Sequence, residues 1–408
     1  PLVFAGHVQI VPVDGRGLVA VGEDGCEVFG GSRFAKLAEL IDGAREEPEI
    51  LAAGNCEGLA EAIMELRRAG LLIDRPTPVP SLPEASWWTS QGINPDIAEA
   101  RIRERAVEVR AMGGIDPGRN VDAMRAAGLR VARGADLDVV LVRDYLEDGL
   151  AEINAAALDD GRPWLLAQPC GAQIFVGPVF SPDRGPCWEC LAQRLREHRS
   201  LARRMLRSAR AADLEISPIQ SLAVVGPALI ATELARWLAG ASPGLESLVL
   251  SFDPRHWQGA RHQVVWRPQC PACGVSDASL QRSAAPIRLR PRSGTSRSSE
   301  SLRRVEPEVM LERFGHHVSA VSGAVPRLTR HAGPPYMHVY GTGGPFRLHG
   351  DPEGWENLVS TQASGKGTSD VQARAGALCE ALERYSGRFA GDEPRRRGTF
   401  EDMKTDAI

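Results

Sequence analysis

The residues best placed to do chemistry lie in one short stretch, residues 365–385, which reads GKGTSDVQARAGALCEALERY. Glu380 and Glu383 are three positions apart, and residues at that spacing are neighbours on a helix surface. Two converging carboxylates near a lysine such as Lys366 can hold Mg²⁺ on a nucleotide phosphate. A solvated row of charges on an amphipathic helix has the same spacing, so the spacing alone leaves both interpretations open.

Four of the eight cysteines form a second chemical pattern, two Cys-x-x-Cys pairs far apart in the chain. Within each pair, two thiolates in a tight turn can bind the same tetrahedral ion. Two such pairs predict a structural Zn²⁺ site with four cysteine ligands and no open coordination position for catalysis. A redox motif is the alternative, but it needs only one pair at a helix start. Metal-bound thiolates are typical of a reducing compartment, so we expect a cytoplasmic protein. The predicted ligands are Cys187, Cys190, Cys270 and Cys273.

Composition excludes several classes of protein. The chain has 408 residues, enough for two or three domains, with 43% hydrophobic and 25% charged residues and a net charge of −4. This balance gives no indication of nucleic-acid binding. An unbroken run of about 18 apolar residues is missing, so the sequence does not predict a membrane span.

A helix must position the two glutamates. Apolar residues recur at three- and four-residue spacing from about Val371 to Ser386, which predicts an amphipathic helix. Ser369 or Asp370 is expected to cap its start. The Gly365-Lys366-Gly367 segment before it is interpreted as a turn.

This stretch resembles the first ATP-binding motif of the YcaO family, which has the pattern Ser-x-x-x-Glu-x-x-Glu-Arg after a Gly-Lys-Gly segment. Gly376 stands where the family usually has Ser. The resemblance implies an enzyme that uses Mg-ATP to phosphorylate a peptide amide oxygen. It covers only about the last hundred residues, so residues 300–408 are expected to be the N-terminal part of an α+β YcaO domain, cut short at its C-terminal side. The implied ATP and Mg²⁺ ligands are Lys366, Glu380, Glu383 and Arg384.

Residues 1–80 predict three short strands followed by three helices, an order typical of a winged helix-turn-helix module. DNA binding is not favoured, because Arg67 and Arg68 are the only basic cluster on the last helix. The order also resembles the leader-peptide recognition element of enzymes that modify ribosomal peptides, where the leader adds as a strand. A small packing domain without a ligand stays open as an alternative. The groove implied by the resemblance is lined by Val28, Phe29, Leu59, Ile63 and Leu66.

Residues 86–283 follow a proline-rich linker and contain several predicted strands, among them Asp136–Val142 and Leu165–Gln168. The glycines at 113–118 lack the Gly-x-Gly-x-x-Gly order, so we do not expect a nucleotide there. Together with the cysteine pairs, this order resembles the Rossmann-type ThiF-like domain of ubiquitin-activating-type enzymes. The resemblance implies a zinc-binding scaffold that has lost adenylation activity.

The three parts together predict an α/β multidomain protein and resemble the fused cyclodehydratases of thiazole/oxazole-modified microcin (bacteriocin-type) pathways. The resemblance implies that Cys, Ser or Thr side chains of a ribosomally made precursor peptide become azolines at the expense of ATP. It also implies a homodimer and makes a flavin dehydrogenase a candidate partner. Thioamide and amidine formation use the same motif and remain open. The rival hypothesis is a non-catalytic scaffold that binds the leader peptide for a separate YcaO enzyme.

Overall fold

The computed structural model describes residues 1–75, 82–183, 185–199, 220–242, 244–275, 305–343, 363–387 and 397–404. The proline-rich linker predicted at residues 76–83 therefore lies mostly outside the described residues. The chain divides into two compact units, which are considered separately below. The first comprises Pro1–Glu108, Gly118–Asp136 and Pro227–Pro243, and the second comprises Val109–Pro117, Leu137–Gly226 and Gly244–Ile408.

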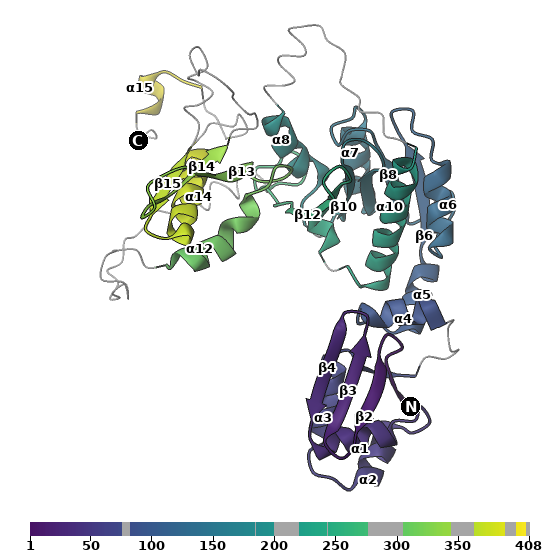
Figure 1. The fold of residues 1–408 in the computed structure, drawn as a ribbon. Coiled ribbons are helices and arrows are strands. Elements are labelled where there is room, and N and C mark those ends of the chain that lie inside the picture. Colours follow the sequence, from purple (N-terminus) through teal and green to yellow (C-terminus); the bar gives the residue numbers. More distant parts are fainter. Residues whose placement is uncertain are drawn as a thin grey trace. The chain divides into compact units, whose positions relative to one another are not determined.

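The first unit begins with a three-stranded antiparallel sheet of order β2-β3-β4 and three helices, labelled in Figure 1. Alternation along β3 turns Leu18 and Ala20 inward, where they are buried in one core with Phe34 and Leu37 of α1. The predicted strands and helices are present, with an added strand β1. The elements are β1 (Leu2–Phe4), β2 (Gln9–Val13), β3 (Gly17–Gly22), β4 (Gly25–Gly30), α1 (Ser32–Leu40), α2 (Glu47–Gly54), α3 (Leu59–Arg68), β5 (Leu72–Asp74), α4 (Leu82–Ser90) and α5 (Pro95–Glu104).

A mixed seven-stranded sheet has the order β12-β11-β10-β9-β8-β6-β7. β8 pairs with β9 in parallel, whereas β9 to β12 pair in antiparallel fashion. Every residue of β8 is buried, including Asp138, whose carboxylate pairs with Arg162 at 2.8 Å. The strands are β6 (Ala106–Ala111), β7 (Arg130–Val131), β8 (Leu137–Leu141), β9 (Trp164–Gln168), β10 (Ile174–Phe180), β11 (Leu248–Asp253) and β12 (Gln258–Gln263); the helices are α6 (Gly118–Ala126), α7 (Leu150–Asp160), α8 (Trp188–His198) and α10 (Leu222–Ala239).

Helix α10 contains Pro227 in its interior and continues through it. Gly226 is needed there because a Cβ would overlap the carbonyl oxygen of Pro169. By length and composition alone α10 could cross a membrane, but core helices of soluble proteins pass the same test, so this is weak evidence.

The last part of the second unit is a three-stranded antiparallel sheet of order β13-β14-β15 with α12 and α14 beside it (Figure 1). Helix α12 begins with a proline, a residue that is favoured in the first turn of a helix. The interpretation of Gly365–Gly367 as a turn was wrong, because these residues pair with β14 as a strand. The elements are α12 (Pro307–Phe314), β13 (Arg327–His331), β14 (His338–Gly343), β15 (Ser364–Gly367), α14 (Asp370–Ser386) and α15 (Phe400–Met403).

The mixed α/β, multidomain character predicted from the sequence is confirmed. Assignment of residues 1–80 to the winged-helix class and of residues 86–283 to the Rossmann class stays a prediction.

Candidate functional site

Helix α14 carries the predicted ATP motif. The Ser369 hydroxyl accepts a hydrogen bond from the backbone N–H of Gln372 at 3.2 Å, so Ser369 is the predicted cap. The glycines of β15 explain how closely the strand and helix approach, because a Cβ at Gly365 would overlap the carbonyl oxygen of Ala373. The helix and its preceding strand therefore form one tightly packed unit.

Glu380 is held from two sides. Its Oε1 accepts a hydrogen bond from Arg384 Nε at 3.0 Å, and its Oε2 accepts one from the backbone N–H of Ser364 at 3.2 Å. The structure thus brings two predicted site residues, Glu380 and Arg384, together at the start of β15. Glu383 is exposed on the same helix.

Lys366 points to the other side of the sheet. Side chains alternate along a strand, and Gly365 faces α14, so the neighbouring Lys366 faces away from the helix. The side chain of Lys366 on β15 therefore does not face the two glutamates on α14.

Gly376 replaces the family's motif serine without filling the space that a side chain would occupy. A Cβ added there would first meet Gly365 Cα, at 3.5 Å, which is an ordinary contact. The position therefore has room for a small side chain.

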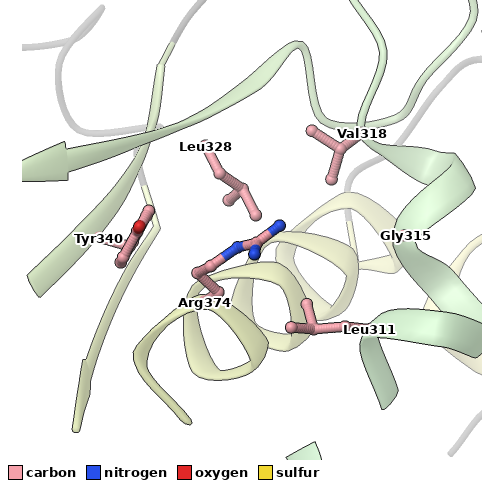
Figure 2. Close-up of a pocket in the computed structure, with 6 residues that line it drawn as sticks. All are labelled: Leu311, Gly315, Val318, Leu328, Tyr340 and Arg374. Carbon is pink, nitrogen blue, oxygen red and sulfur yellow. The ribbon is translucent and has the colours of Figure 1, made fainter. Parts of the chain in front are cut away.

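A pocket of about 360 Å³ lies beside α14, between α12, β13 and β14 (Figure 2). Its walls are mostly aliphatic, and Arg374 supplies a cation. The sequence alone does not reveal this pocket, because the pocket is formed by segments that are distant in sequence. The lining residues are Leu311, Gly315, Val318, Leu328, Tyr340 and Arg374.

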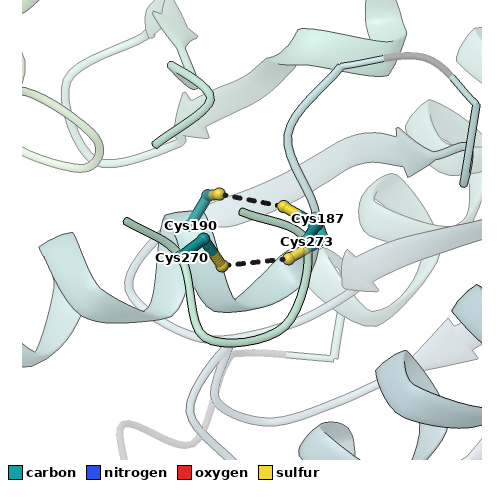
Figure 3. Close-up of side chains that lie close together, drawn as sticks. All are labelled: Cys187, Cys190, Cys270 and Cys273. Atoms are coloured by element: carbon teal, nitrogen blue, oxygen red, sulfur yellow. Dashed lines mark hydrogen bonds between the residues drawn. The ribbon is translucent and has the colours of Figure 1, made fainter. Parts of the chain in front are cut away.

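The four predicted metal ligands come together in the second unit (Figure 3). The Sγ atoms of Cys187 and Cys270 are 3.6 Å apart, as are those of Cys190 and Cys273, and all four lie within 4.8 Å of one another. A tetrahedral ion with metal–sulfur bonds of about 2.3 Å requires sulfur separations of about 3.8 Å. The cluster therefore fits a metal ion with four thiolate ligands.

The thiols of this cluster interact strongly. The interaction with Cys187 lowers the pKa of Cys273 to about 7 and raises the pKa of Cys190. Four thiolates this close repel one another unless a cation lies among them. The donor set is soft, which suits Zn²⁺.

The predicted peptide groove is divided between exposed and buried residues. Leu59, Ile63 and Leu66 of α3 are buried in the module's core. Val28 is 75% exposed on β4, which is an edge strand of its sheet, whereas Phe29 faces inward against Phe34. The peptide-binding role of these five residues stays a prediction.

Arg67 gives no sign of a DNA-binding surface. Its guanidinium lies 3.1 Å from both Glu47 and Asp74, so these two carboxylates in the same module neutralise the cation. A guanidinium that contacts DNA phosphates is instead oriented outward.

Comparison with known proteins gives two kinds of match. Residues 364–408 match the family model described as YcaO cyclodehydratase, ATP- and Mg²⁺-binding. The fold resembles a heterocyclase solved in complex with substrate and cofactor, with a TM-score of 0.78 and 29% sequence identity over 98% of this chain and 56% of that one. It also resembles the heterocyclase TruD, with a TM-score of 0.69 and 26% identity over 98% of this chain and 54% of that one.

The predicted resemblance to fused YcaO-type cyclodehydratases is confirmed. This chain spans about half the length of those heterocyclases. E. coli MccB shares the fold over 72% of this chain and 99% of its own, with a TM-score of 0.51 and 13% identity. None of the curated protein sequences compared with this chain matches it.

Proposed function

We propose that this chain takes part in the ATP-dependent cyclodehydration of Cys, Ser or Thr residues in a ribosomally made precursor peptide of a bacteriocin-type pathway. One observation carries the proposal: almost the whole chain superimposes on a heterocyclase whose structure holds substrate and cofactor. The match to the YcaO model at residues 364–408 supports the same reaction class.

Mg-ATP, when bound, supplies the phosphoryl group that activates the amide oxygen of the peptide. Glu380 and Glu383 offer the oxygen donors that Mg²⁺ prefers. Glu380 is already oriented by Arg384 and by the Ser364 backbone, which lowers the cost of arranging it when the ion binds. Lys366 lies on the opposite face of β15 and faces away from these glutamates, so in this proposal the phosphate charge is met by the Mg²⁺ ion and not by Lys366.

The precursor peptide would be captured by the first module. β4 is an edge strand of its three-stranded sheet, so its outer backbone groups can pair with an added strand. Val28 presents an exposed apolar side chain on this strand. In this proposal the leader binds along β4 and the core peptide reaches the ATP site.

The four clustered cysteines would hold a structural Zn²⁺. Three of their side chains are buried and all four thiolates are ligands, so a substrate has no coordination position to occupy. The ion would stabilise the scaffold that connects peptide capture with ATP use. A cytoplasmic location follows from thiols kept reduced for metal binding.

Calorimetric titration tests the proposal directly. The full chain is titrated with Mg-ATP and, separately, with the precursor peptide encoded beside its gene. We expect both to bind, and we expect Glu380→Gln with Glu383→Gln to abolish only Mg-ATP binding. The matched control is Glu308→Gln, an exposed glutamate on α12 that should leave both affinities unchanged.

A leader-binding scaffold is the second candidate function, and the direction of Lys366 away from α14 favours it. Binding of the peptide without detectable binding of Mg-ATP would establish the scaffold. If neither molecule binds, both functions are wrong.

A further inference from the structure

The pocket beside α14 lies on a different side of the helix from the ATP motif. Arg374 and Glu383 are nine positions apart, which is about two and a half turns of an α-helix, so their side chains leave α14 in opposite directions. Glu380 is directed instead toward Ser364 at the start of β15. A ligand in the pocket would thus be separate from a nucleotide on the motif glutamates.

The walls of the pocket are suited to an aliphatic group. Leu311, Val318 and Leu328 converge on it from three different segments (Figure 2). The volume of about 360 Å³ is at the lower end of the range, about 300–1,000 Å³, in which small ligands are bound. Gly315 adds no side chain to the wall, and a Cβ placed there would meet nothing within 4 Å.

Arg374 is the cation of this pocket, and its guanidinium is directed between Leu328 and Val318 (Figure 2). Asp370, one turn earlier on α14, does not neutralise it. The Asp370 carboxylate instead accepts a hydrogen bond from the Tyr340 hydroxyl at 2.8 Å and lies 3.7 Å from His338 Nδ1. In the described part of the chain, Arg374 has no ion-pair partner.

Tyr340 completes the polar side of the pocket. Its hydroxyl donates to Asp370, and this hydrogen bond raises the pKa of Tyr340 above its usual value. The phenol therefore stays protonated and turned toward Asp370, and its ring forms the wall. Arg374 is left as the group that can meet an anion.

From these contacts we infer that the pocket binds a carboxylate carried on a short aliphatic group, with Arg374 as its anion partner. A guanidinium matches a carboxylate through two parallel N–H···O bonds, while the aliphatic walls take the apolar part. The ligand is the C-terminal residue of a peptide ending in an aliphatic side chain or a free aliphatic acid, since both have this chemistry. The inference does not depend on the proposed function.

Ligand-observed NMR on the full chain tests the inference with three probes, each used up to about 10 mM. They are N-acetyl-leucine, its amide N-acetyl-leucinamide, and 4-methylpentanoate. We expect the carboxylates to bind at least about fivefold more tightly than the amide, in line with a solvent-accessible ion pair. Tighter binding of N-acetyl-leucine identifies a peptide terminus, and tighter binding of 4-methylpentanoate identifies a free acid.

Variants assign the binding to the pocket. Arg374→Gln should reduce carboxylate binding to the level of the amide, and Val318→Phe should block all three probes by filling the space. The control is Arg330→Gln, which removes an exposed arginine on the neighbouring β13. Thermal melting of each variant verifies that it is folded.

Three results would overturn the inference: equal binding of acid and amide, unchanged binding to folded Arg374→Gln, or no binding of any probe to the wild type. Competition by Mg-ATP would also contradict it, because the two sites are on different sides of α14. Failure of Mg-ATP to bind at all would sink the catalytic proposal and leave this pocket unaffected.

Discussion

The guanidinium of Arg194 lies 4.3 Å from the centroid of the Tyr385 ring, which joins α8 to α14 within the second unit. Helix α8 starts beside Cys187, one of the four clustered cysteines, and α14 carries the YcaO motif. Arg194 also pairs with Glu197 at 3.4 Å, and its side chain is 13% exposed. The contact therefore connects the helix that starts at the cysteine cluster with the motif helix through a largely buried cation.

Replacing Tyr385 should weaken this connection. Tyr385→Leu removes the ring but keeps an apolar side chain, so we expect the free energy of unfolding to fall by about 1 kcal/mol. Tyr385→Phe retains the ring face and should change it little. Urea denaturation measures both, and equal losses for Phe and Leu would show that the ring does not attract Arg194.

Removing the proposed Zn²⁺ should unfold the scaffold locally. Cys190→Ser or a strong chelator is expected to lower the free energy of unfolding by about 3 kcal/mol or more, because metal binding and folding are coupled. Cys26→Ser, at an exposed cysteine, is the control and should be neutral. Cobalt substitution gives an independent test, since four thiolates produce a tetrahedral absorption spectrum that Cys190→Ser should alter.

Two glycines at the strand–helix contact should respond in opposite ways. Gly365→Ala forces a Cβ into the backbone of α14, so we expect clear destabilisation. Gly376→Ala places its Cβ at an ordinary 3.5 Å from Gly365, and it should stabilise α14 by up to about 1 kcal/mol through helix propensity. Thermal denaturation compares the variants, and a stabilised Gly365→Ala would contradict the packing described.

Acid should destabilise the second unit through His262. Burial lowers the pKa of His262, whose Nε2 lies 2.8 Å from Ser251 Oγ and whose Nδ1 lies 2.9 Å from Ser319 Oγ. Ser319 Oγ accepts two backbone N–H groups, so its proton is donated to Nδ1 and the ring is held neutral. The unfolded chain then binds the proton more readily, and stability falls as the pH drops below about 6.5.

The measurement is the urea midpoint at about pH 7.5 and about pH 5.5. The wild type should lose more stability on acidification than His262→Asn does. His317, whose pKa burial lowers to about 4, shares this direction, so part of the slope should persist in the variant. His331→Asn, at an exposed histidine, should keep the full slope of the wild type.

Some features of the structure could be predicted from local sequence patterns. Apolar periodicity and a capping residue predicted α14 to within one residue of its start at Asp370. Such signals involve neighbours in sequence, which a helix brings together whatever the rest of the fold does. The two Cys-x-x-Cys pairs could also be recognised locally, because the two cysteines of each pair are close in sequence.

Contacts between distant segments could not be predicted in this way. Gly365–Gly367 has the composition of a turn, but pairing with β14 and packing on α14 make it a strand. Strands β11 and β12 were not predicted. Strand β12 is polar along most of its length, and it is its pairing with β11 that makes it a strand.

The sequence by itself determined the family resemblance, the motif helix and the four cysteines, because these depend on residue type and short spacing. The tertiary structure decided which side chains meet. It joined Glu380 to Ser364, turned Lys366 to the other face of β15, and placed Arg374 at the edge of a pocket with aliphatic walls. These arrangements depend on strand register and helix packing, which come from the simultaneous burial of many residues and not from any one segment.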